Sequence, residues 1–117
     1  MPHVVIEEAC DLGAACAGLK PSMVRNGSEI LKVVDVYLNQ TRRTALVDCV
    51  VIEDENAQSF FVQLAQKDRQ ITVRLLPATD PEKTSGVKRL MGQIAKQLHE
   101  LTLGSHFGKT NLQEFLE

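Results

Sequence analysis

Apolar and polar residues alternate along the middle of this 117-residue chain. Arg43–Glu53, Ser59–Gln66 and Ile71–Leu76 each show a period of two, which is typical of β-strands that bury one face. Two polar loops of four residues, 54–57 and 67–70, lie between neighbouring runs, and such short loops predict hairpins and therefore an antiparallel meander. We expect one face of the meander to line the core, because it collects only apolar residues. These are Val47, Cys49, Val51, Phe60, Val62, Leu64, Ile71, Val73 and Leu75.

A different period follows the meander. Over Pro81–Leu103 apolar residues recur every three or four positions, which predicts one long amphipathic α-helix. Asp80 is a good N-cap, proline fits the first helical position, and Gly104 suits the C-terminal end. We expect the apolar stripe of this helix to cover the core face of the sheet. The stripe consists of Val87, Leu90, Met91, Ile94, Ala95, Leu98 and Leu101.

The N-terminal part of the chain is less regular. Glu29–Leu38 fits two patterns, an amphipathic helix with apolar residues three and four apart, and a strand rich in β-branched residues. We favour the helix, because the polar residues of this segment gather on one helical side. Val4–Ile6 is a candidate strand, and Asp11–Gly18 is a candidate for one or two helical turns.

These patterns predict a single α+β domain over residues 1–117. Its two layers are an antiparallel meander of three or four strands and the long C-terminal helix packed on one face. A second, N-terminal helix is expected elsewhere on the sheet. Residues 1–27 form a less regular N-terminal segment in this interpretation, and residues 104–117 form a C-terminal tail.

Composition narrows the class of protein. The net charge of −2 and the pI near 5.9 argue against a nucleic-acid binder, which normally carries a basic excess. No apolar run approaches the roughly 18 residues of a membrane span, so no membrane association is expected. The N-terminus lacks the basic and long apolar regions of a secretory signal. We therefore expect a cytoplasmic protein.

Cysteine and histidine residues show no metal or cofactor signature. The spacing of Cys10, Cys16 and Cys49 matches neither a CxxC pair nor a zinc half-site. The three histidines have no ligand spacing among themselves or with the cysteines. We interpret the cysteines as small buried hydrophobic residues in a reducing compartment, and we expect neither a metal nor a cofactor.

The second face of the predicted meander is half polar. If each hairpin closes symmetrically around its four-residue loop, Asp48 faces Gln63 and Gln63 faces Arg74, with Phe61 on the same face. In one interpretation the polar groups satisfy one another beneath a cover, either the Glu29–Leu38 helix or a second subunit. In another, Arg74 contacts a small anionic ligand and Asp48 tunes that contact.

These features favour a non-enzymatic interaction domain. A half-apolar face without an obvious cover is typical of a surface that self-associates or binds a protein partner. We expect Asp48, Gln63, Phe61 and Arg74 to lie in that contact, in a homo-oligomer or in a complex with another protein.

The two chain ends resemble a family of enzymes. Met1-Pro2-His3 followed by Val4-Val5-Ile6-Glu7, and the tail Lys109-Thr110-Asn111-Leu112-Gln113-Glu114-Phe115-Leu116, look like the ends of carboxymethyl-hydroxymuconate isomerases of the tautomerase superfamily. The resemblance implies that the initiator methionine is removed and that Pro2 acts as general base, because an N-terminal amine titrates at about pH 7.7–8.0. It also implies parallel βαβ units, whereas the residue pattern predicts antiparallel hairpins. An isomerase is therefore the alternative function.

Overall fold

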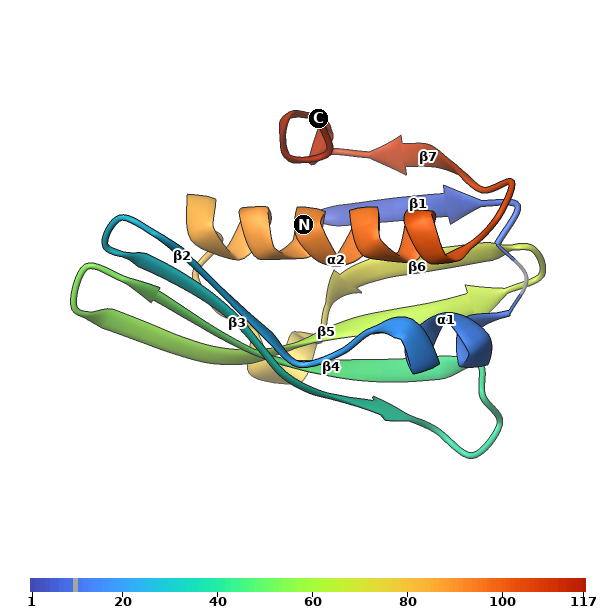
Figure 1. Cartoon of the computed structure of the whole chain (residues 1–117), viewed down its shortest axis with the longest axis horizontal. Helices are drawn as coiled ribbons and strands as arrows, with labels where there is room; N and C mark the ends of the chain where they lie inside the picture. Colours follow the sequence, from blue (N-terminus) through green and yellow to red (C-terminus); the bar gives the residue numbers. More distant parts are fainter. Residues whose placement is uncertain (10) are drawn as a thin grey trace.

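The computed structural model describes residues 1–9 and 11–117, and one antiparallel sheet dominates it. Seven strands lie in the order β2-β3-β4-β5-β6-β1-β7, and each neighbouring pair is antiparallel. The sheet curves around α2 as a half-barrel (Figure 1). The strands are β1 (His3–Glu7), β2 (Ser22–Asn26), β3 (Glu29–Leu38), β4 (Thr44–Glu53), β5 (Asn56–Lys67), β6 (Gln70–Leu75) and β7 (His106–Thr110). The helices are α1 (Leu12–Gly18), α2 (Ser85–Leu101) and the short 3₁₀ helices η1 (Pro77–Thr79) and η2 (Gln113–Phe115).

The predicted fold class, a meander of three or four strands with a second N-terminal helix, is wrong. The sheet has seven strands, because Ser22–Asn26, Glu29–Leu38 and both chain ends join the three strands of the meander. Glu29–Leu38 is the strand β3, which pairs with β2 on one side and with β4 on the other. Two flanking strands satisfy its backbone hydrogen bonds, and this pairing outweighs the helical pattern of its polar residues.

The chain ends form the far side of the sheet. β1 pairs with β6, and β7 pairs with β1, so that Val4 lies opposite Thr110. The predicted strand at Val4–Ile6 is confirmed, since it lies within β1, whereas β7, with five residues, is too short for a period of two to stand out in the sequence. The two termini therefore complete the sheet on the side opposite β2.

The prediction for the core face is confirmed. All nine meander side chains assigned to the core are at most 1% exposed. The stripe of α2 covers them and is equally buried from Val87 to Leu98, whereas Leu101 at the end of the helix is 45% exposed. Each large apolar side chain contributes roughly 1.5–3 kcal/mol when it is fully removed from water. The contact between α2 and the inner face of the sheet is therefore the main source of stability.

The start of α2 differs from the prediction. The helix begins at Ser85 rather than at Pro81, and its N-cap is Thr84, whose Oγ1 accepts a hydrogen bond from the Val87 backbone N–H at 3.3 Å. Pro81 is buried in the connection between the sheet and the helix. Thr84 caps the helix and also contacts Glu53 of the sheet, and these contacts favour a start at Ser85 over the start that the Asp-Pro signal predicts.

Two carboxylates at the end of the sheet hold the first turns of α2. Glu53 of β4 accepts hydrogen bonds from the Thr84 hydroxyl and from the Gly86 backbone N–H, the latter at 3.1 Å. A β-carbon at Gly86 would lie 2.7 Å from the Glu53 carboxyl carbon, so only glycine permits this approach. Glu29 of β3 forms an ion pair with Arg89 one turn further along. Negative charge at a helix N-terminus also interacts favourably with the helix dipole.

Replacing Glu53 should therefore weaken the protein. We expect Glu53→Ala to lower the free energy of unfolding by about 1.5–3 kcal/mol, the range for hydrogen bonds to a charged group. Glu55→Ala, in the exposed turn two residues away, is the matched control and should change it by less than about 0.5 kcal/mol. Urea denaturation measures both values. Equal stability of the two variants would contradict the anchoring role.

Cys16 and Cys49 are buried free thiols, as predicted. Cys10 lies outside the described residues, so the prediction made for it stands untested. Burial raises the pKa of the Cys49 thiol to about 12, and the nearby Asp48 charge adds to the effect. Burial also raises the pKa of Cys16, against an opposing influence from Arg42. At neutral pH such thiols are protonated and are poor nucleophiles.

The Cys49 thiol should make stability depend on alkaline pH. Its pKa is 9.0 as the reference value and about 12 in the fold, so the folded state keeps the proton longer. This contribution to stability is fully present below pH 9 and is lost as the pH rises from about 9 to about 12. Between about pH 8 and about pH 10.5 the free energy of unfolding should fall about 2 kcal/mol further in the wild type than in Cys49→Ala. Urea denaturation at both pH values tests this, and parallel losses would contradict it.

Candidate functional site

We call the side of the sheet that faces away from α2 the outer face. Both α-helices lie on the opposite, inner side (Figure 1). The Glu29–Leu38 helix expected as a cover is absent, since that segment is β3 and adds its own side chains to the outer face. The side chains of this face are half-buried or exposed. They include Glu7, Met23, Arg25, Thr44, Ser59 and Gln70, together with His3, Val5, Ile30, Lys32, Asp35, Tyr37, Leu46, Asp48, Val50, Ile52, Phe61, Gln63, Ala65, Thr72 and Arg74.

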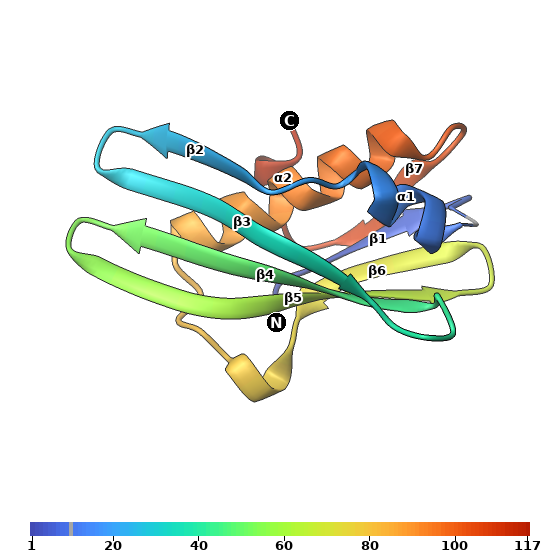
Figure 2. The same cartoon turned by 60° about the horizontal axis from the view of Figure 1, so that its bottom comes forward.

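The middle of the outer face is apolar and hollowed. A depression of about 290 Å³ lies there, and Tyr37 on its border is 52% exposed. η1 stands at the margin of the face and projects away from α2 (Figure 2). There the Thr79 Oγ1 accepts a hydrogen bond from the Phe61 backbone N–H at 3.0 Å. The depression is lined by Tyr37, Leu38, Asn39, Thr44, Leu46, Gln63 and Leu76.

The structure brings the predicted site residues together as two pairs, Gln63 with Arg74 and Asp48 with Phe61. Gln63 lies directly opposite Arg74, and the Arg74 Nε donates a hydrogen bond to the Gln63 Oε1 at 2.7 Å. Asp48 lies opposite Phe61 instead of Gln63, because the β4–β5 turn contains two residues rather than four. Asp54 opens this turn with a φ of 56°, a conformation that aspartate tolerates. The shift of two residues changes the partner of Asp48 but leaves it on the predicted face.

A second carboxylate, which the sequence analysis placed on a helix, lies beside Asp48. A β-bulge after Val33 turns Asp35 to the outer face, directly opposite Asp48 on the neighbouring strand. Like charges in directly opposed positions destabilise a sheet. The Asp35 Oδ1 accepts a hydrogen bond from the Val36 backbone N–H at 2.8 Å. The paired valines at this position, Val33 and Val34, are the one signal in the sequence that the alternation breaks here.

Arg74 is the cationic residue among the predicted site residues, and it lies on the other side of β5. Arg74 is exposed, and His3 of β1 lies directly opposite it. The ion pairs of residues 1–9 and 11–117 are Arg69–Glu8, Lys83–Asp80, Arg89–Glu29 and His106–Glu7. Within that part of the chain, Asp35, Asp48 and Arg74 thus take part in no ion pair. On the outer face Asp35 and Asp48 therefore lie on one side of β5 and Arg74 lies on the other, while Lys32 of β3 and Glu7 of β1 add a charge of the opposite sign to each side.

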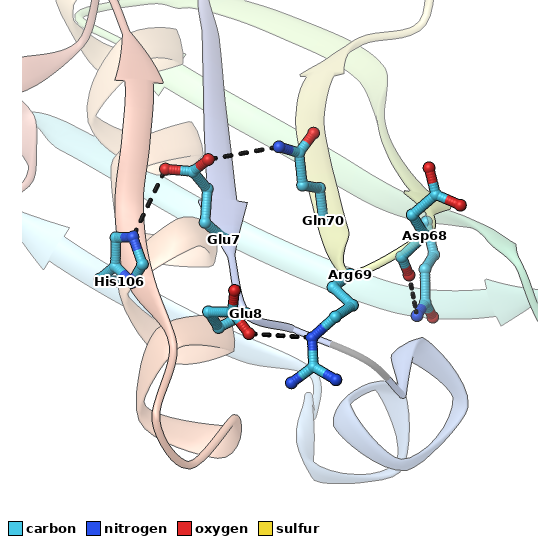
Figure 3. Close-up of polar contacts among 7 residues, drawn as sticks. Glu7, Glu8, Asp68, Arg69, Gln70 and His106 are labelled. Carbon is cyan, nitrogen blue, oxygen red and sulfur yellow. Dashed lines mark hydrogen bonds and ion pairs between the residues drawn. The ribbon is translucent and has the colours of Figure 1, made fainter.

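A separate polar cluster joins the ends of β1, β6 and β7 (Figure 3). Glu7 accepts a hydrogen bond from the Gln70 side-chain amide at 3.3 Å and lies 3.4 Å from the His106 Nε2. Arg69 and Glu8 form an ion pair at 2.9 Å next to it. These side chains are well exposed, and exposed ion pairs contribute little to stability. The cluster ties strand ends together at the surface of the protein.

Pro2 is buried at the junction of the two chain ends. The Asn111 side-chain amide donates to the Met1 carbonyl at 2.8 Å, and its carbonyl accepts from the His3 backbone N–H at 3.0 Å. Lys83 and Lys88, which the sequence analysis did not single out, border a pocket of about 190 Å³ beside Pro2. That Pro2 acts as a base stays a prediction.

Two other features, a metal-binding group and a membrane-spanning helix, are not found among the described residues. Residues 1–9 and 11–117 contain no group of three or more histidine, cysteine, aspartate or glutamate side chains placed to hold a metal ion. None of the described helices has the length and apolar character needed to cross a membrane. No family model, no curated protein and no solved structure matches this chain.

Proposed function

We propose that this chain is a non-enzymatic cytoplasmic module that self-associates through its outer face. The observation that carries the proposal is the half-apolar outer face, with its depression of about 290 Å³, left uncovered by both α-helices. Exposed apolar surface of this kind marks interaction sites. The buried free thiols Cys16 and Cys49 support a reducing compartment.

The side chains of the depression suit a binding role. Tyr37 offers a large, mostly rigid contact surface with a polar tip, and aromatic residues are enriched among the side chains that dominate binding energy. Leu46 and Leu76 border the same depression and are half-buried, so a partner surface would complete their removal from water. Gln63 adds a polar group that can select the register of the contact.

Loss of the apolar side chains should dissociate the assembly. We expect the wild type to form dimers or larger assemblies at micromolar concentrations. The double variant Tyr37→Ser, Leu46→Ser should raise the dissociation constant about tenfold or more, because each lost contact removes about 1 kcal/mol or more of binding free energy. Sedimentation equilibrium and light scattering measure the assembly state.

The control for this experiment is Leu103→Ser. Leu103 is fully exposed in the loop between α2 and β7, so the same chemical change is made away from the outer face. Circular dichroism melts verify that each variant is folded. A wild type that stays monomeric at every workable concentration would overturn the proposed function.

A specific observation supports the second candidate, an isomerase of the carboxymethyl-hydroxymuconate type. Pro2 borders a pocket with Lys88 and with Lys83, which is paired with Asp80, and the Lys88 ammonium group would attract an anionic substrate. After removal of Met1, the proline amine would lie in this pocket as the base. The two chain ends that carry the family resemblance also lie side by side, through the pairing of β1 with β7.

The isomerase candidate has a direct test. Intact-mass spectrometry shows whether Met1 is removed. If the candidate is correct, the wild type catalyses ketonisation of a 2-hydroxymuconate, and Pro2→Ala lowers the rate by a factor of about 100 or more. Lys88→Ala should raise KM for this substrate. The control Lys20→Ala, at an exposed loop position, should leave KM unchanged. Retention of Met1, or activity that survives Pro2→Ala, would exclude Pro2 as the base.

A further inference from the structure

The outer face carries charges that its own chain does not compensate. Asp35 and Asp48 are directly opposed carboxylates, and neither forms an ion pair within residues 1–9 and 11–117. Arg74 is exposed and donates its Nε to a neutral amide, so its positive charge meets no carboxylate in that part of the chain. A paired acid and a guanidinium attract strongly when they meet in hydrogen-bonding geometry.

Asp48 and Arg74 do not meet within one chain. Asp48 lies on β4 and Arg74 on β6, and β5 separates the two strands by roughly 9.6 Å, two strand spacings. Phe61 and Gln63 of β5 occupy the space between them on the outer face. Asp48 and Arg74 therefore face the same way, on either side of β5.

We infer that the outer face packs against the same face of a second copy of this chain, about a two-fold axis that runs along β5. Such an axis places β4 of one copy over β6 of the other. Asp48 of each copy then meets Arg74 of the partner subunit, and the contact occurs twice because the interface is self-complementary. This inference rests on the proposed self-association and adds its geometry.

The charges select this axis over its alternative. A two-fold axis across the strands would lay β4 and β6 each over its own copy, so that Asp48 would not lie over Arg74 of the partner subunit. The axis along β5, by contrast, lays β4 over β6 and brings these two residues together. Asp48 and Arg74 differ by two residues along the strands, roughly 6.8 Å, an offset that an arginine side chain can span. Aligned packing of two sheets is also the common arrangement in sandwiches.

The axis also gives the apolar centre a partner. Phe61 lies on β5, and Leu46 lies diagonally from it on β4, opposite Gln63, so these side chains of the two copies meet close to the axis. Aromatic and aliphatic side chains at the middle of an interface, ringed by charges, follow the usual arrangement of protein interfaces. The charged contacts would set the orientation, and the apolar centre would supply most of the affinity.

Charge reversal with complementation tests the geometry. Asp48→Arg and Arg74→Asp should each raise the dissociation constant of the homodimer about tenfold or more, because each places like charges in both contacts. An equimolar mixture of the two variants should form heterodimers with nearly wild-type affinity, since both contacts then pair opposite charges. Native mass spectrometry of two variants of different mass counts homodimers and heterodimers directly. Glu100→Arg and Lys20→Asp, exposed and away from the outer face, are the matched controls.

A milder variant keeps the test informative if a reversal destabilises the chain. Asp48→Asn removes the repulsion from Asp35 and should raise the melting temperature of the monomer, measured at a concentration well below the dissociation constant. The same variant should weaken the dimer, because the contact with Arg74 of the partner subunit is lost. A dimer unaffected by Asp48→Asn would overturn the inference.

The outcomes separate this inference from the proposed function. A wild-type dimer that dissociates with Tyr37→Ser, Leu46→Ser but ignores both charge reversals would use the outer face in another orientation, which overturns the inference alone. Variants that dissociate singly but fail to recover as a mixture would also overturn it. A monomeric wild type would overturn both proposals.

Discussion

The contact between the apolar stripe of α2 and the inner face of the sheet is the interaction on which the rest of this structure depends. It removes from water nine side chains of the meander and the stripe from Val87 to Leu98. The sheet must curve to surround one helix, and the curvature gives the half-barrel seen in Figure 1. Glu53 and Glu29 then hold the first turns of α2, so that the position of the helix along the sheet is set by polar contacts as well.

This arrangement leaves the other side of the sheet without a cover. Both α-helices of residues 1–9 and 11–117 lie on the inner side, so neither of them buries the outer face. A sheet with one face packed and one face solvated normally alternates apolar with polar residues. Here the solvated face instead keeps Tyr37, Leu46, Val50, Ile52 and Phe61. That departure from ordinary alternation is the reason for placing function on the outer face.

Two local irregularities decide how the charges of that face are distributed. The β-bulge after Val33 brings Asp35 opposite Asp48, and the two-residue turn at Asp54 moves Asp48 away from Gln63. As a result these two acids lie on β3 and β4 while Arg74 and His3 remain on the other side of β5. Asp35 and Asp48 repel each other in the monomer, and Arg74 has no ion-pair partner within residues 1–9 and 11–117. Both observations favour a partner that supplies the opposite charges.

The sequence by itself determined the direction of each meander side chain, the existence of α2 and the pairing of Gln63 with Arg74, because these depend on periodicity and on a short turn between neighbours in the chain. Only the tertiary structure decided that Glu29–Leu38 is a strand and that β1 and β7 extend the sheet. Their backbone groups pair with segments that lie far away in the chain, such as Val4 with Thr110, and local patterns carry no record of such partners. The same holds for Asp35, whose place opposite Asp48 exists only once β3 and β4 have met.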